Sequence, residues 1–268
     1  MNRNTIFITG AASGIGLETA RLFAQKGWFV GATDVNEGGL ATLAGEIGED
    51  RCFTAVMDVT RPETVRRALD GFAGRTEGRL DVLFNNAGIA RMGPFDEIAL
   101  GDQLGIVDVN LKGVVTVTYT ALPLLKATPG SRIISMASTS AVYGVPELAV
   151  YSATKHAICS FTEALDLELE PHGIAVSDIL APYVRTPLVT EAGRQAYSVQ
   201  KTGINLVPEQ VAALVWKAAH RHRLHWRIHF LTHALVFTFW LFPFLRRPIV
   251  RHLALTPSRP GSATSRTQ

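Results

Sequence analysis

Cysteine is scarce in this chain, and little sequence precedes its first apolar segment. The 268 residues include only two cysteines, Cys52 and Cys159, so a disulfide framework is not expected. The four residues Met1–Asn4 stand before an apolar strand pattern and leave no room for a signal peptide. We therefore expect a cytoplasmic protein, or one on the cytoplasmic face of a membrane.

Acidic residues are missing from the C-terminal part of the chain. None follows Glu209, whereas nine basic residues do: Lys217, Arg221, Arg223, Arg227, Arg246, Arg247, Arg251, Arg259 and Arg266. A charge asymmetry of this kind is typical of an interaction segment. Nucleic-acid binding by this basic segment is not expected.

Between Arg227 and Arg246 lie 18 residues without charge, rich in Phe, Trp and Leu. As a helix this run would be about 27 Å long, at the short limit of a membrane span. Polar residues interrupt it, and Pro243 would break its last turn. Peripheral membrane contact through 224–252 is favoured over a cover for the substrate pocket or a subunit contact, and over a membrane-spanning anchor.

Three histidines in this region, His225, His229 and His233, are spaced by four and raise the question of a metal. No carboxylate or cysteine stands near them in the sequence, so no metal site is expected. Residues 256–268 are rich in Ser, Thr and Pro and are predicted to be disordered.

Short β-branched strand patterns alternate with helical patterns along the rest of the chain. This alternation predicts a Rossmann-type, doubly wound parallel α/β sheet in a single domain. The chain length and its 47% apolar content agree with one sizeable core. The expected strands lie near 4–9, 28–34, 51–57, 80–84, 131–137 and 174–180.

The first strand pattern runs directly into a glycine-rich turn, after which a helical pattern begins. Glycines there allow the backbone to approach a pyrophosphate, and the helix N-terminus offers free amides. The second strand ends at Asp34, 18 residues after Gly16, where a carboxylate accepts hydrogen bonds from an adenosine ribose. A helix-capping Asp34 is the alternative. The turn residues expected to contact a dinucleotide are Gly10, Ser13, Gly14, Ile15 and Gly16.

Tyr151 and Lys155 are four residues apart, which places both side chains on one face of a helix. An ammonium group near a phenol favours the phenolate and makes the hydroxyl a usable proton donor and acceptor. Such a pair is also common on solvated helix faces, so the remaining motifs decide its meaning.

These motifs resemble the short-chain dehydrogenase/reductase family over roughly residues 4 to 220. The glycine turn resembles the cofactor turn of the family. Asn110, Ser138, Tyr151 and Lys155 match its catalytic tetrad, with 28 and 13 residues separating the first three. The resemblance places further cofactor contacts at Asp58, Val59, Asn86, Ala87, Gly88, Pro182, Val184 and Thr186, in addition to Tyr151 and Lys155.

The resemblance also implies a role for each member of the tetrad. Ser138 would orient a carbonyl oxygen, and Tyr151 would donate or remove its proton. Lys155 would hold the nicotinamide ribose, and Asn110 would position a water that links Lys155 to solvent. Taken singly, Ser138 could instead be a turn residue and Asn110 a helix kink.

The sequence favours NAD over NADP. Asp34 would repel a ribose 2′-phosphate, and the turn residues Ala11 and Ala12 supply no basic charge. Because cells keep NAD mostly oxidised, alcohol oxidation is the favoured direction.

The substrate region departs from the family pattern at Tyr183, where relatives commonly have Gly. Its ring is expected to form a wall of the pocket or to shift the loop. Apolar residues suggest a lipophilic alcohol or carbonyl substrate, and their expected positions are Met92, Phe95, Val145, Leu148, Tyr183 and Leu188.

The sequence therefore predicts a catalytic domain at 1–223, an apolar and basic segment at 224–255 and a tail at 256–268. The expected function is NAD(P)-dependent interconversion of a secondary or lipophilic alcohol and its ketone or aldehyde. A non-catalytic NAD-binding regulator or membrane-associated scaffold is the alternative. By family likeness we expect a homodimer or homotetramer, formed through helices near 96–127 and 150–171.

Overall fold

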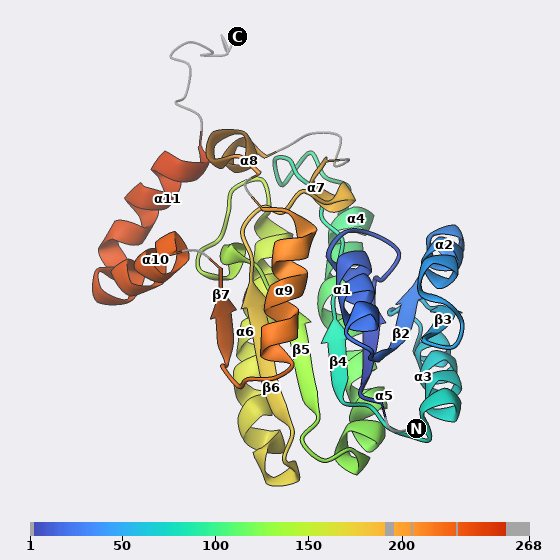
Figure 1. Ribbon diagram of the computed structural model, residues 1–268. Helices are drawn as coiled ribbons and strands as arrows, with labels where there is room; N and C mark the ends of the chain where they lie inside the picture. Colours follow the sequence, from blue (N-terminus) through green and yellow to red (C-terminus); the bar gives the residue numbers. More distant parts are fainter. Residues whose placement is uncertain (1–2, 191–195, 205, 229, 256–268) are drawn as a thin grey trace, which may run out of the picture.

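A computed structural model describes residues 3–190, 196–204, 206–228 and 230–255. Its centre is a seven-stranded parallel sheet in the order β3-β2-β1-β4-β5-β6-β7 (Figure 1). The strands are β1 (Thr5–Thr9), β2 (Phe29–Asp34), β3 (Cys52–Val56), β4 (Val82–Asn85), β5 (Arg132–Met136), β6 (Ala175–Leu180) and β7 (His225–Arg227). The six strands expected from the sequence are confirmed, as is the doubly wound fold.

Helices cover both faces of the sheet. One apolar core joins the sheet to α1 (Gly14–Gln25), α2 (Glu37–Ile47) and α9 (Pro208–Ala218). A second core joins the opposite face to α3 (Pro62–Thr76), α5 (Val114–Ala127) and α6 (Ala149–Leu169). Phe7, Phe29 and Phe72 are fully buried in the second core. Burial on both faces explains why the strands read as nearly continuous apolar runs.

The strand order reverses between β1 and β4. β1 pairs with β2 on one side and with β4 on the other, with Ile6 opposite Val30 and Val82. The chains leaving β1 and β4 at their carboxyl ends therefore diverge to different sides of the sheet. Crevices at such switch points are where ligands bind in doubly wound folds.

Short helices and loops follow the carboxyl ends of the strands. α4 (Leu100–Val107) continues through the π-helical segment η1 (Asp108–Gly113) into α5. The 3₁₀ turn η2 (Thr139–Ala141) follows β5, and η3 (Glu170–His172) follows α6. Beyond β6 lie α7 (Pro187–Thr190) and α8 (Tyr197–Thr202), and beyond β7 lie α10 (Phe230–Leu241), η4 (Pro243–Leu245) and α11 (Arg246–Ala254).

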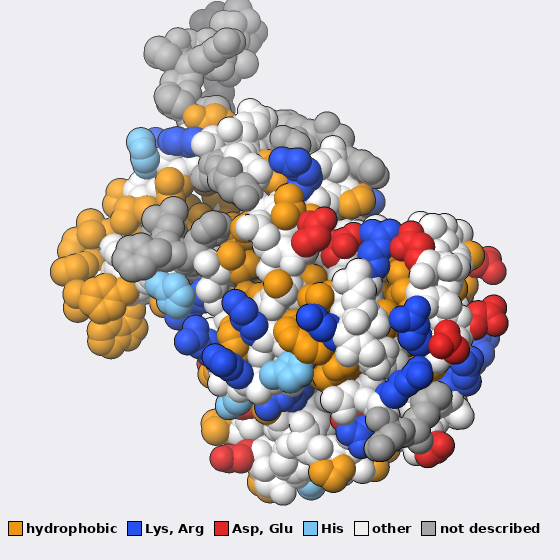
Figure 2. Space-filling model, in the orientation of Figure 1, with side chains coloured by type: hydrophobic (Ala, Val, Ile, Leu, Met, Phe, Trp, Pro, Cys, Tyr) orange, Lys and Arg blue, Asp and Glu red, His pale blue; other side chains and the backbone are white. Residues whose placement is uncertain are grey.

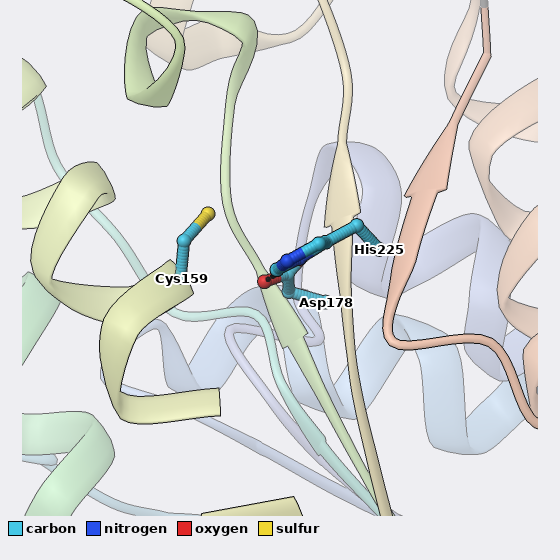
Figure 3. Close-up of side chains that lie close together, drawn as sticks. All are labelled: Cys159, Asp178 and His225. Atoms are coloured by element: carbon cyan, nitrogen blue, oxygen red, sulfur yellow. Dashed lines mark hydrogen bonds and ion pairs between the residues drawn. The ribbon is translucent and has the colours of Figure 1, made fainter. Parts of the chain in front are cut away.

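The seventh strand was not expected, because residues 224–255 were predicted to form a separate segment. His225–Arg227 instead extends the sheet beside β6, with Asp178 opposite His225. The Asp178 carboxylate is fully buried and accepts hydrogen bonds of 2.9 and 3.0 Å from His225 Nδ1 (Figure 3). This contact between side chains fastens a strand of only three residues, too short to be recognised from its pattern.

We expect this pair to stabilise the folded protein. His225→Gln leaves the buried Asp178 without a cationic partner, and we expect a loss of about 3 kcal/mol in the free energy of unfolding. Hydrogen bonding to Asp178 raises the pKa of His225 above its usual value of 6.5. The contribution is therefore complete below about pH 6.5 and is lost as the pH rises through the raised pKa.

Chemical denaturation between pH 5 and 9 measures this effect. His172→Gln, which changes an exposed histidine on η3, is the matched control and should follow the wild type. If the stability of His225→Gln varies with pH as the wild type does, the ion pair does not hold β7.

Candidate active site

A cavity of about 350 Å³ opens at the carboxyl ends of the strands. The glycine turn and the ends of β2 and β3 line one part of it, and the loops after β4, β5 and β6 line the rest. All of the predicted cofactor contacts except Gly16 border this cavity. Of the predicted catalytic residues, Ser138, Tyr151 and Lys155 border it, whereas Asn110 lies behind the wall.

The glycine turn owes its shape to a close approach of backbone to backbone. A Cβ on Gly16 would lie 2.0 Å from the carbonyl oxygen of Gly10, so only glycine fits there. Gly10 has a φ of +68°, a conformation that L side chains rarely adopt. The side chain of Asn86, after β4, donates hydrogen bonds to the carbonyls of Thr9 and Gly10 at 3.0 and 2.9 Å. The turn is thus held across the switch point.

Asp34 faces the same turn from the end of β2. Its carboxylate accepts hydrogen bonds from the amides of Ala12 at 2.9 Å and Asn36 at 3.0 Å. It does not cap α2, because the side chain of Asn36 accepts from Gly39 and occupies that position. The capping alternative is therefore wrong for Asp34. Its contact with Ala12 instead fixes the carboxylate beside the glycine turn.

Asp58 lies farther along the cavity, after β3. Its carboxylate accepts hydrogen bonds from the amide and hydroxyl of Thr60 at 2.9 and 2.7 Å. These contacts shape the loop that leads into α3. Asp58 and the adjacent Val59 both lie on the cavity wall.

Tyr151 and Lys155 come from the first turns of α6 and reach the end of β5. Lys155 is buried and donates a 2.8 Å hydrogen bond to the carbonyl of Met136. Its Nζ lies 5.5 Å from the centre of the Tyr151 ring. The hydroxyl of Ser138 forms a hydrogen bond with the Tyr151 phenol and also accepts one from the amide of Ser140 at 3.2 Å.

Burial governs the acidity of both groups. It raises the pKa of Tyr151 to about 12, although the hydrogen bond from Ser138 acts in the opposite direction. It lowers the pKa of Lys155 to about 8. The expectation that the ammonium group lowers the pKa of Tyr151 is therefore wrong, because burial has the larger effect. The Tyr151 phenol is therefore neutral near pH 7.

Asn110 is fully buried in the π-helical segment η1. Its side-chain oxygen accepts from the amide of Ile89 at 2.8 Å, and its amide donates to the Ile89 carbonyl at 2.9 Å. Asn110 therefore lies in a helix irregularity and also contacts the loop after β4, because the wide π-helical turn directs its side chain at that loop. A Cβ on Gly88 would lie 3.3 Å from Asn110 Oδ1 and 3.8 Å from Lys155 Nζ, so the three residues converge.

Apolar side chains form the other end of the cavity. Met92, Val145, Leu148, Tyr183 and Leu188 line it as expected. Phe95 does not: its side chain is 64% exposed and lies outside this cavity. It instead borders a separate, smaller cavity with Gly93 and Ile98, and the sequence offered no sign of that direction.

Tyr183 forms part of the wall, the first of the two outcomes expected for it. Its hydroxyl forms a 2.6 Å hydrogen bond with Ser198 on α8, which joins the loop after β6 to the helix above it. Several further wall residues were missed in the sequence, although most stand beside a predicted motif: Val35, Met57, Ile89, Ala90, Val109, Met136, Ala137, Thr139, Ser140 and Ala181.

Potential metal ligands gather away from this cavity. In the part of the chain that the structure describes, the ligand atoms of Cys159, Asp178 and His225 lie within 4.8 Å of one another (Figure 3). The fold therefore brings a cysteine and carboxylates from distant parts of the sequence to His225, including Glu163, which lies 3.3 Å from its Nε2. Both ring nitrogens of His225 already face carboxylates, so the cluster is explained as an ion pair.

The glycine turn, the switch-point cavity and the acidic residue after β2 define a nucleotide-binding α/β protein of the doubly wound class. The sequence matches the family model described as short chain dehydrogenase over residues 4–197. The chain therefore belongs to the short-chain dehydrogenase family.

Individual relatives agree with this assignment. The chain is 36% identical over 223 residues to the oxidoreductase UcpA of Escherichia coli K12, which covers 82% of this chain and 81% of the relative. It is 32% identical to a cyclohexanol dehydrogenase from Acinetobacter, covering 80% and 86%. A 3-ketoacyl-(acyl-carrier-protein) reductase from Brucella melitensis, solved with NADH, superposes with a TM-score of 0.75 at 28% identity, covering 84% and 96%.

The close approach at Gly16 makes a prediction about stability. Gly16→Ala forces the turn open, and we expect a loss of at least 2 kcal/mol in the free energy of unfolding, measured by chemical denaturation. Gly45→Ala is the matched control, because nothing lies within 4 Å of a Cβ there. Gly45 lies inside α2, so that change should raise stability by roughly 0.5–1 kcal/mol. Equal effects of the two substitutions would contradict the geometry of the turn.

Proposed function

We propose that this protein is an NAD-dependent oxidoreductase that interconverts a lipophilic secondary alcohol and its ketone, or an alcohol and its aldehyde. One observation carries the proposal: Ser138, Tyr151 and Lys155 share a cavity with the glycine turn and Asp34. A dinucleotide lying along this cavity would place its two ends at these two groups of residues.

The residues present fit a nicotinamide dinucleotide. The close approach of Gly16 to the carbonyl of Gly10, which any Cβ would prevent, keeps the turn tight, and Gly10, Ser13 and Gly14 of this turn line the cavity where a pyrophosphate would lie. Asp34 presents its carboxylate at the end of β2, where it accepts from a ribose hydroxyl. The family and the NADH held by the Brucella relative support a nicotinamide cofactor. When bound, the cofactor supplies the hydride acceptor or donor, and the protein supplies orientation and electrostatics.

The proposed chemistry of the chain is proton transfer at the substrate oxygen. Ser138 donates a hydrogen bond that aligns this oxygen with the Tyr151 phenol. Tyr151 donates the proton in reduction and removes it in oxidation. Lys155, held by Met136, provides positive charge when protonated, which favours the phenolate during oxidation. Asn110 holds the loop after β4 in place and keeps the region near Lys155 polar.

The apolar end of the cavity supports a lipophilic substrate. Met92, Val145, Leu148 and Leu188 offer no charge and few hydrogen-bonding groups to a bound molecule. The relative named cyclohexanol dehydrogenase supports an alicyclic or longer-chain alcohol. The hydroxyl of the substrate would then be its one polar anchor, beside Ser138 and Tyr151.

We further propose that the protein forms a homodimer or homotetramer. Large apolar side chains are exposed on neighbouring helices of one face: Leu100 (70%), Leu104 (54%), Val115 (42%) and Tyr119 (76%) on α4 and α5, and Leu167 (72%) on α6. Exposed apolar side chains gathered in this way are typical of subunit contacts.

Removal of one hydroxyl tests the catalytic role. Tyr151→Phe should lower kcat for NADH formation with a panel of cyclic and long-chain alcohols by about 10²- to 10⁴-fold. The Kd for NADH should change by less than about threefold, because the aromatic ring remains. The absorbance of NADH at 340 nm measures kcat, and a fluorescence titration measures the Kd for NADH.

Tyr143→Phe is the matched control, because Tyr143 lines the same cavity outside the proposed tetrad. Its kcat should stay within about threefold of the wild type. Equal rates in the wild type and Tyr151→Phe would exclude the mechanism and favour a protein that binds the cofactor without turnover.

Cofactor preference tests the role of Asp34. The wild type should use NAD with a kcat/KM at least 100-fold above that for NADP, because a carboxylate repels the 2′-phosphate. Asp34→Asn removes the charge, and we expect it to reduce this ratio at least tenfold. Asp58→Asn is the matched control: it should affect both cofactors equally. A wild type that uses both cofactors equally well would contradict the proposed preference for NAD.

A further inference from the structure

An exposed apolar surface lies at the C-terminal end of the described chain. It is formed on α10 and the turn after it by five side chains with large exposed fractions: Phe237 (61%), Trp240 (78%), Leu241 (46%), Phe242 (42%) and Phe244 (72%). Figure 2 shows hydrophobic side chains gathered at the left of the molecule, where α10 lies. We call these five residues the aromatic surface. Such a contiguous patch marks an interaction site rather than ordinary surface.

Other side chains of the same segment attach it to the body of the protein. Phe239 is buried and packs edge-on against Tyr143, with ring centres 5.9 Å apart. Arg246 donates a 2.8 Å hydrogen bond to the carbonyl of Val142. Ala254, at the end of α11, is buried in the apolar cluster that also contains Val199 of α8. The segment is therefore docked on its inner side, and the aromatic surface is what remains outside.

The positive charge of the segment indicates which kind of partner it would bind. Arg246, Arg247 and Arg251 of α11 are exposed beside the aromatic surface, and no acidic residue follows Glu209 in the chain. Two copies of the segment would bring like charges together, whereas anionic lipid headgroups attract them. Trp and Phe flanked by arginine are typical of segments that lie at the membrane–water interface.

The helices are too short to cross a bilayer. α10 has 12 residues and would be about 18 Å long, and α11 has nine. Throughout the described ranges, no helix is long and apolar enough for a membrane span. Of the ways in which the segment could contact a membrane, a helix that lies in the interface agrees with these lengths.

We propose that α10, η4 and α11 form a docking surface for an anionic lipid bilayer. The aromatic surface inserts among the headgroups and upper acyl chains, and Arg247 and Arg251 contact lipid phosphates. Because Tyr143 contacts both Phe239 and the cavity, the attached protein would hold the apolar end of its cavity close to the membrane. The attachment itself requires neither cofactor nor substrate and is therefore independent of the proposed function.

Vesicle flotation with the full chain tests the attachment. The wild type should float with vesicles of phosphatidylcholine containing 30% phosphatidylglycerol, and at least tenfold less should float with phosphatidylcholine alone. Phe237→Glu/Phe244→Glu should lower the partition coefficient for the anionic vesicles at least tenfold. Arg247→Glu/Arg251→Glu should do the same without changing the aromatic surface.

Matched controls carry the same substitutions elsewhere. Phe95→Glu changes an aromatic side chain that is 64% exposed, and Arg66→Glu/Arg67→Glu reverses two exposed charges on α3. Both controls should float like the wild type, and all variants should have unchanged thermal midpoints. Failure of the wild type to float, equal flotation with both kinds of vesicle, or equal loss in the controls would overturn the proposal.

Sedimentation velocity without lipid tests whether a second copy of the chain covers the aromatic surface instead. The wild type and Phe237→Glu/Phe244→Glu should have the same mass if the aromatic surface serves the membrane. A lower mass for the variant, with no flotation of the wild type, would overturn the proposal and assign the surface to a contact between subunits.

Discussion

The contact between Gly16 and the carbonyl of Gly10 is the constraint on which the site depends. It allows the chain to leave β1 and enter α1 within one tight turn, and Asn86 joins that turn to the end of β4. Residues at the carboxyl ends of both strands line the cavity. Because no Cβ fits at Gly16, the position of the turn is determined by backbone geometry and does not depend on the choice of neighbouring side chains.

Hydrogen bonds to the backbone hold the polar groups of the cavity in place. Lys155 is tied to Met136, Asn110 to both polar groups of Ile89, and Asp34 to the amide of Ala12. Groups positioned in this way need little rearrangement when a substrate arrives, which favours catalysis by preorganised electrostatics. The same burial keeps Tyr151 neutral and lowers the pKa of Lys155 to about 8.

Much of this could be predicted from the sequence, because the determining features are local. The glycine turn, the strand that ends at Asp34 and the four-residue spacing of Tyr151 and Lys155 each follow from short patterns with a direct structural meaning. The roles assigned to the site residues stay predictions. Features that depend on distant contacts were not accessible: the direction of Phe95, the pKa of Tyr151 and the strand β7. That strand has three residues, and its place is set by Asp178, 47 residues earlier.

A crystal structure of this protein in complex with NADH would test the central claim most directly. The account predicts that the pyrophosphate lies against Gly10 and Gly14, that Asp34 accepts from the adenosine ribose, and that the nicotinamide ribose contacts Tyr151 and Lys155. A nucleotide bound elsewhere, or bound here with its nicotinamide far from Tyr151, would contradict the account.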